Sequence, residues 1–188
     1  MKNLKTIALA LLVAFGTTTV TAQTKKVDVS KSQITWVGKK VTGQHEGTIN
    51  LQDGALVFKG KKLTGGNFTV DMSTISTTDL SGKGKTSLDG HLKAEDFFGT
   101  DKYPTSKLVF KTIADKGNNT YTVTADLTIK EITNPITFDV VVNKGVAKTK
   151  LTVDRTKYDI KYGSGSFFDG LGDKTISDNF ELNVALQF

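Results

Sequence analysis

Alternation of apolar and polar residues constrains the fold of this chain more than any other feature of its sequence. In the stretch 121–130, apolar residues hold every second position, with Thr, Asp and Lys between them. Successive side chains of a strand point to opposite faces, so this pattern predicts a strand with one buried face. The pattern recurs over 136–142 and 180–188, and Gly, Asn and Asp clusters separate the segments. We therefore predict about eight strands in an antiparallel barrel or sandwich.

One stretch departs from this alternation. Within 86–98, Leu88 and Leu92 have the spacing of one helical face, and a Gly and a Pro follow soon after. A short helix in a β chain must rest on the sheet to bury its apolar face, and Phe97 and Phe98 are the expected anchors. Two interpretations stay open, namely a covering helix that plugs one barrel end and a lid over an apolar cavity.

The N-terminus has the features of a secretory signal. Two lysines precede an apolar run, Ile7–Phe15, that is too short to span a membrane, and small residues precede a cleavage point after Ala22. We predict that residues 1–22 are a signal peptide and that 23–188 form one domain, which is periplasmic or secreted.

Composition excludes several classes of function. The chain has no Cys, which excludes thiol catalysis, zinc–thiolate sites and iron–sulfur clusters. Its basic residues are nearly all Lys, and Arg155 is the only Arg. Because nucleic-acid readers depend on Arg, we expect no nucleic-acid partner. The lysines either keep strand faces soluble or attract the protein to an anionic lipid surface.

A set of short motifs resembles a known family. In chain order they are Trp36, the turn Gly43–Gly47, Val70-Asp71-Met72 with Ile75, His-Leu-Lys-Ala-Glu-Asp-Phe-Phe at 91–98, Lys-Tyr-Pro at 102–104, Leu-Val-Phe at 108–110, 126–130, Asp154-Arg155 and Tyr162-Gly163. The ordered set covers nearly all of 23–188 and resembles the YceI-like family of exported, lipocalin-like proteins that bind polyisoprenoid lipids. The resemblance implies an eight-stranded lipocalin-like barrel. Glu131 stands where family members commonly have Gly, which leaves the type of that turn open.

An apolar channel is the expected binding site. The interior of an eight-stranded barrel is just filled by side chains or holds one small ligand. Burial of each methylene group is worth about 0.8 kcal/mol, which suits a linear prenyl chain. The alternative is a solid core. The residues that we predict to line the channel are Trp36, Phe58, Phe68, Val70, Phe97, Phe98, Phe110, Tyr121, Val123, Leu127, Phe138, Val140, Leu151, Val153, Leu182 and Val184.

The mouth of the channel is assigned on chemical character. Thr156–Thr175 is the longest irregular segment, and such long segments are usually functional or mobile. Aromatic residues with one polar end suit a boundary between lipid and water. The residues predicted to surround the lipid head group are Lys39, His45, Arg155, Tyr158, Phe167 and Phe168.

Motifs for catalysis are lacking. His45 and Glu46 are adjacent, so on a strand they point to opposite faces, and 163–166 lacks the Gly-Lys-Ser/Thr of a phosphate loop. We therefore predict no catalytic residue, no metal site and no covalent cofactor. The expected function is binding of a polyisoprenoid or isoprenoid quinone as carrier, buffer or storage protein, with transient contact to a membrane surface or a membrane redox protein. The alternatives are a solid-core partner of an envelope protein and, less favoured, an envelope hydrolase.

Overall fold

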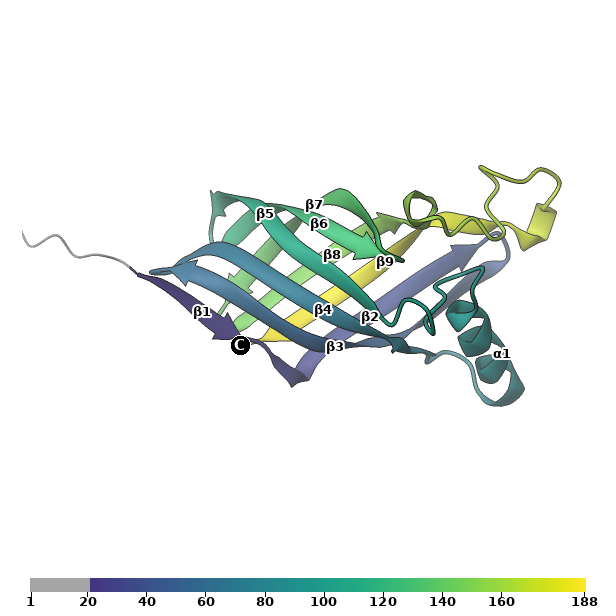
Figure 1. The fold of residues 1–188 in the computed structure, drawn as a ribbon, viewed down its shortest axis with the longest axis horizontal. Coiled ribbons are helices and arrows are strands. Elements are labelled where there is room, and N and C mark those ends of the chain that lie inside the picture. The colour runs from purple at the N-terminus through teal and green to yellow at the C-terminus, as the bar shows by residue number, and fades with distance from the viewer. Residues whose placement is uncertain (1–20) are drawn as a thin grey trace, which may run out of the picture.

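The computed structural model describes residues 21–188, so the predicted signal peptide 1–22 lies outside them except for its last two residues. Strands dominate the chain, with one α-helix and two short 3₁₀ helices among the described residues (Figure 1). The elements are β1 (Ala22–Lys26), β2 (Asp28–Lys40), β3 (Gly43–Lys59), β4 (Lys62–Thr77), α1 (Gly82–Lys93), β5 (Thr105–Gly117), β6 (Thr120–Ile129), β7 (Ile132–Asn143), β8 (Val146–Asp154), η1 (Arg155–Tyr158), η2 (Gly172–Lys174) and β9 (Ile176–Gln187).

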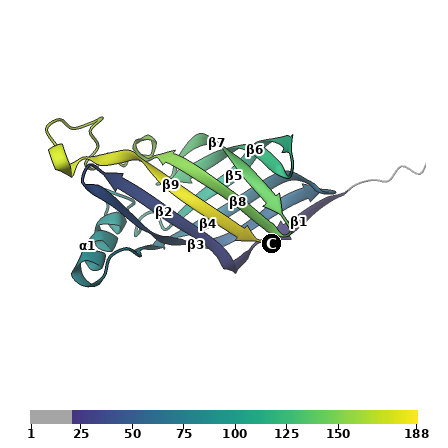
Figure 2. The same ribbon diagram turned by 180° about the vertical axis from the view of Figure 1, so that it is seen from behind.

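The strands close into a barrel. Each strand from β2 to β8 pairs antiparallel with the next, and β9 pairs with both β8 and β2, which closes a ring of eight strands (Figure 2). β1 pairs with the second half of β3, from Ala22 opposite Lys59 to Lys26 opposite Ala55, while β2 pairs with its first half. The first strand is therefore built in two pieces along β3. This arrangement confirms the predicted eight-stranded antiparallel barrel.

Five hairpins turn within two residues, and three of them have positive φ at both turn residues. These three turns are Asn118-Asn119, Lys130-Glu131 and Lys144-Gly145. Positive φ at both central positions defines the type I′ turn, whose twist matches that of the flanking strands. Glu131 (φ 62°) thus keeps the left-handed geometry that Gly would adopt at lower cost.

The helix begins and ends earlier than the predicted 86–98. It ends at Lys93 because Ala94 adopts an extended conformation, and its N–H bonds back to the carbonyls of Gly90 and His91. A tight turn follows, in which the Phe98 N–H donates to the Leu92 carbonyl over 3.2 Å. Phe97 and Phe98 therefore belong to this turn and not to the helix, and the turn places both side chains in the interior.

The two ends of the barrel differ, and we name them by their connections. The hairpin end carries the β3–β4, β5–β6 and β7–β8 turns and lies at the left of Figure 1. The helix end carries α1, the segment 94–104 and the segment 155–175, and lies at the right of the same view.

Candidate functional site

The barrel encloses an apolar cavity, so its interior is not a solid core. The centre of a water-sized sphere can occupy about 170 Å³ of it. One water-sized group needs about 10–15 Å³ on this measure, so the cavity has room for roughly a dozen methylene-sized groups. A longer chain would have to extend beyond the cavity or displace side chains.

Most of the residues predicted to line a channel lie on the cavity wall. They are Trp36, Phe68, Val70, Phe97, Phe98, Phe110, Leu127, Phe138, Val140, Leu151, Leu182 and Val184. They come from seven of the strands and from the turn after α1, because alternate residues of each strand point inward. Sequence reasoning missed Met72 and Ile75 of β4, which also line the wall.

Four predicted lining residues do not reach the cavity. Phe58, Tyr121, Val123 and Val153 are buried, but none lines the wall. The Phe58 ring stacks on that of Phe188, with centroids 5.4 Å apart. Leu56 and Leu186, two residues before each ring on the same strand faces, do line the cavity. The stacked pair therefore closes the cavity at the hairpin end.

Gly38 leaves open space in the wall on β2. It follows Ile34 and Trp36 on the inward face, and a Cβ placed on it would meet no atom within 4 Å. The β2–β9 register shifts between Gly38 and Lys40, as at a bulge. The missing side chain therefore enlarges the cavity near the helix end.

Aromatic rings close the helix end. Phe97 and Phe98 are each 7% exposed and meet edge to face, with centroids 5.1 Å apart. The Phe98 ring also meets that of Phe180 at 6.2 Å. The Arg155 guanidinium lies 5.7 Å from the centroid of the Phe97 ring, within the range of a cation–π contact.

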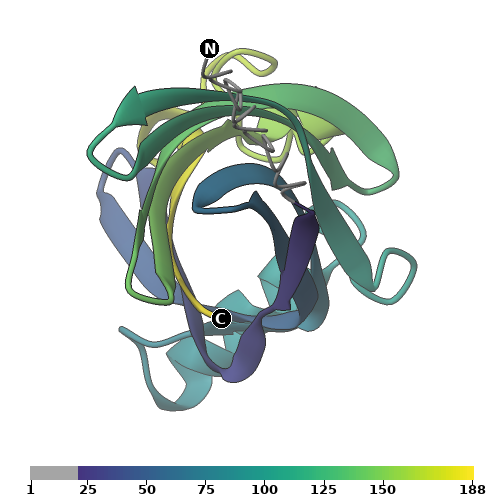
Figure 3. The same cartoon turned by 90° about the vertical axis from the view of Figure 1, so that its left-hand side faces the viewer.

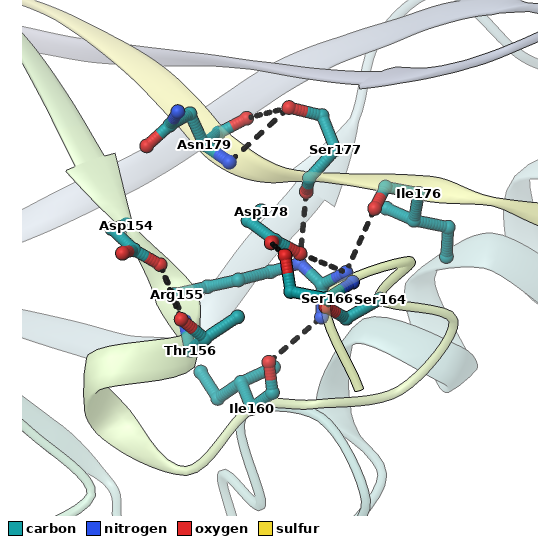
Figure 4. Close-up of polar contacts among 10 residues, drawn as sticks. All are labelled: Asp154, Arg155, Thr156, Ile160, Ser164, Ser166, Ile176, Ser177, Asp178 and Asn179. Carbon is teal, nitrogen blue, oxygen red and sulfur yellow. Dashed lines mark hydrogen bonds and ion pairs between the residues drawn. The ribbon is translucent and has the colours of Figure 1, made fainter. Parts of the chain in front are cut away.

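Arg155 holds the chain together at this end (Figure 4). Its side chain is 2% exposed, and it donates hydrogen bonds to the carbonyls of Ser177 (2.9 Å), Ile160 (2.7 Å) and Ile176 (3.1 Å). Its Nη2 lies 3.7 Å from Asp178 Oδ1. Burial lowers the pKa of Arg155, and the Asp178 carboxylate opposes that shift. Arg155 thus joins η1, the following loop and β9 through bonds to main-chain carbonyls, and its predicted head-group role stays a prediction.

The other predicted mouth residues are not gathered at one place. Lys39 lines the cavity, and its Nζ is 2.8 Å from Glu181. His45 instead pairs with Asp79 at 2.8 Å, away from the wall. Tyr158 is buried, and this desolvation raises its pKa to about 12.

Phe167 and Phe168 are half exposed on the 155–175 segment and line no part of the cavity. Of the six predicted mouth residues, only Lys39 and Arg155 line the cavity, and the head-group role of the set stays a prediction.

A set of polar contacts that was not predicted from the sequence, here called the latch, fixes α1 to β4. Lys85 Nζ donates to Asp89 Oδ2 (2.9 Å), to the Thr77 carbonyl (2.6 Å) and to Ser76 Oγ. Asp89 also accepts the Thr77 N–H at 2.7 Å. Burial would raise the pKa of Asp89, but these hydrogen bonds outweigh it and lower that pKa to about 2. The spacing of Lys85 and Asp89, one helical turn apart, was the available signal.

The histidines are engaged in packing and pairing. The His91 ring lies 4.5 Å from that of Tyr162 and 5.1 Å from that of Phe97. Within residues 21–188, neither His91 nor His45 is hydrogen-bonded to a hydroxyl group, and no three His, Asp or Glu side chains gather as a metal site. None of the helices in this part of the chain is long and apolar enough to cross a membrane.

Comparison with known proteins points to one family. The profile of the YceI-like domain matches residues 26–188. A UPF0312 protein of Shewanella denitrificans is 34% identical over 91 residues, which are 48% of this chain and 46% of that protein. One of Pseudomonas putida is 31% identical over 97 residues, 52% of this chain and 48% of that protein. The chain thus spans about half the length of the curated relatives it matches.

Solved structures share the fold. BcnA of Burkholderia cenocepacia matches with a TM-score of 0.66 and 24% identity, over 85% of this chain and 98% of that one. A polyisoprenoid binding domain from Saccharophagus degradans, implicated in plant cell wall breakdown, matches with a TM-score of 0.57 and 12% identity, over 86% and 95%. The Campylobacter jejuni YCEI protein matches with a TM-score of 0.55 and 16% identity, over 99% and 90%. At these identities the likeness shows the fold.

Proposed function

We propose that this chain, which belongs to the YceI-like family, binds an isoprenoid lipid in the barrel cavity. The ligand would be a polyisoprenoid or an isoprenoid quinone. The protein would act without catalysis, as a carrier, buffer or storage protein, in the periplasm or outside the cell after loss of residues 1–22.

The observation that carries this proposal is the apolar cavity of about 170 Å³ inside a closed barrel. Burial of a dozen methylene-sized groups would contribute roughly 10 kcal/mol before the costs of ordering, which suffices for binding without polar contacts. The polyisoprenoid binding described for the Saccharophagus degradans domain supports the choice of ligand.

Non-catalytic action is supported by the side chains at the cavity. The charged residues on its wall are Lys39, which is paired with Glu181, Arg155, which is bonded to main-chain carbonyls, and Lys107. Among residues 21–188, no carboxylate or imidazole side chain lines the cavity to act as a general base. The match to a binding-protein family agrees with this view.

Loading and unloading would require contact with a membrane, because a free prenyl lipid is nearly insoluble in water. We therefore include a transient membrane contact in the proposal. A quinone ligand would in addition bring the protein close to membrane redox proteins.

The test is native mass spectrometry of protein purified from its own envelope, followed by organic extraction of the ligand. Gly38→Phe should fill the cavity without a backbone clash and lower lipid occupancy at least tenfold, because the site of the new Cβ is open. Val37→Phe, on the same strand but outside the lining, is the matched control and should keep wild-type occupancy. Protein that is always empty and takes up no prenyl lipid would overturn the proposal, as would Gly38→Phe protein with wild-type occupancy.

A further inference from the structure

Basic side chains surround the hairpin end of the barrel. We call them the basic ring: Lys25 of β1, Lys59, Lys61 and Lys62 at the β3–β4 turn, Lys116 at the β5–β6 turn and Lys144 at the β7–β8 turn. Figure 3 looks along the barrel from this end and shows the turns around it. Most lysines of the ring lie on these turns or beside them.

Most of this charge is uncompensated. Lys62 lies 3.5 Å from Asp115, and Lys116 lies 2.8 Å from Asp139. Within residues 21–188, the other four lysines of the ring have no carboxylate within ion-pair distance.

The helix end has a smaller excess. Its segments α1, 94–104 and 155–175 together hold seven lysines, Arg155 and seven acidic residues. The helix end thus contributes a net charge of only about +1, whereas four of the six lysines in the basic ring have no ion-pair partner among residues 21–188. A partner attracted by charge would meet the hairpin end first.

The hairpin end also lies over an end of the cavity. The stacked side chains of Phe58 and Phe188 lie between the basic ring of lysines and the cavity wall. The Nζ of Lys25 lies 5.5 Å from the centroid of the Phe58 ring and 5.3 Å from that of Phe188. A surface that bound the basic ring would thus face the two rings that close the cavity.

The composition of the ring favours a lipid surface over a nucleic acid. All its members are lysines, and the chain's single Arg is buried at the opposite end. Lys binds phosphate as a point charge and does not provide the forked donor pair that reads bases. Each Lys near an anionic bilayer strengthens binding roughly fivefold at low ionic strength.

We propose that the hairpin end docks on an anionic phospholipid bilayer through the basic ring. The proposal deepens the membrane contact proposed above and rests on it for its biological role. It places the Phe58–Phe188 pair between the bilayer and the cavity, as the barrier that a lipid would pass.

The experiment is sedimentation of the protein with vesicles of phosphatidylcholine alone or of phosphatidylcholine mixed with phosphatidylglycerol. We expect the wild type to bind the mixed vesicles at least tenfold more tightly than the neutral ones, and we expect added salt to weaken that binding. The variant Lys59→Glu/Lys61→Glu/Lys144→Glu should lose at least tenfold in affinity. The control Lys83→Glu/Lys157→Glu/Lys174→Glu changes the net charge equally at the helix end and should stay within about twofold of the wild type.

Several results would overturn the docking proposal. One is equal loss in both triple variants, which would indicate a general charge effect. Another is salt-independent binding to neutral vesicles that is lost in Phe167→Ser/Phe168→Ser, which would place the contact at the helix end. A third is wild-type protein that binds an oligonucleotide and neither type of vesicle.

Lipid content measured in the same samples separates the two proposals. The ring variant should still take up prenyl lipid from detergent, because no ring residue lines the cavity. Empty wild-type protein that docks on anionic vesicles would remove lipid carriage and leave docking intact. Wild-type protein that carries lipid but does not bind anionic vesicles would remove docking and leave lipid carriage intact.

Discussion

The two ends of this barrel join the same strands by different means. At the hairpin end, the turns Asn118-Asn119 and Lys144-Gly145 need only a local left-handed backbone. At the helix end, polar side chains of the long segments 78–104 and 155–175 bond back to the sheet. Asp89 accepts the N–H of Thr77 in β4, and Arg155 donates to carbonyls at the start of β9 and to that of Ile160. Short connections thus take their conformation from their own backbone, whereas the long ones are held in place by a few polar side chains.

The largest difference between the ends should come from Arg155. Arg155→Met leaves three main-chain carbonyls without their donor and should lower the free energy of unfolding by about 3–5 kcal/mol. Lys144→Met at the hairpin end should change it by less than about 0.5 kcal/mol. Urea denaturation measures both, and a loss below about 1 kcal/mol for Arg155→Met would refute the role given to this residue.

A smaller effect is expected from Gly47, toward the helix end of β3. A Cβ there would lie 2.0 Å from the Ser76 carbonyl oxygen and 2.5 Å from the Trp36 ring, so Gly47→Ala should destabilise the protein by about 3 kcal/mol. Gly90→Ala in α1 meets open space and should stabilise it by roughly 0.5–1 kcal/mol. Thermal unfolding of the two variants checks the contrast, which would fail if both shifted Tm in the same direction.

Acid should loosen the helix end through Asp89. Its pKa is lowered to about 2 in the folded protein from an ordinary 3.8, so its hydrogen bonds stabilise the fold above about pH 4. That contribution should be lost as the pH falls from 4 to 2, and it amounts to roughly 1 kcal/mol after allowance for partial exposure. Denaturation at several pH values should show a weaker acid dependence in Asp89→Asn than in the wild type. If the stability of Asp89→Asn fell with pH as steeply as that of the wild type, the stabilising role given to the Asp89 contacts would be wrong.

The smallest effect concerns a turn at the helix end that resembles those of the hairpin end. Glu131 holds a left-handed backbone without being Gly, so Glu131→Gly should stabilise the protein by about 0.5–1 kcal/mol. Asp115→Gly, which removes a side chain beside a turn that already has favourable residues, should give no such gain. Equilibrium unfolding distinguishes them, and a loss of stability in Glu131→Gly would show that the turn is not strained.

The sequence by itself determined the strands and their faces. In β6, residues from Tyr121 to Ile129 alternate between buried and partly exposed, as the period-2 pattern predicted. This information is local, because successive residues of an extended segment point to opposite faces of the sheet. Whether a residue has an odd or an even position in the strand therefore decides which face it is on. Ten of the sixteen predicted lining residues lie on strands and reach the cavity for the same reason, and Phe97 and Phe98 reach it from the turn after α1.

Only the tertiary structure decided where the cavity ends and which residues close it. Phe58 and Leu56 point to the same face of β3, yet Phe58 stacks on Phe188 and Leu56 lines the cavity wall. The β1–β3 and β2–β9 pairings decide this difference, because they set how far along the barrel axis each residue lies. Arg155 directs its donors to the carbonyls of Ile160, Ile176 and Ser177, which only the folded chain brings together around it. Such positions depend on pairing between distant segments and on closure of the ring, and no local pattern in the sequence encodes them.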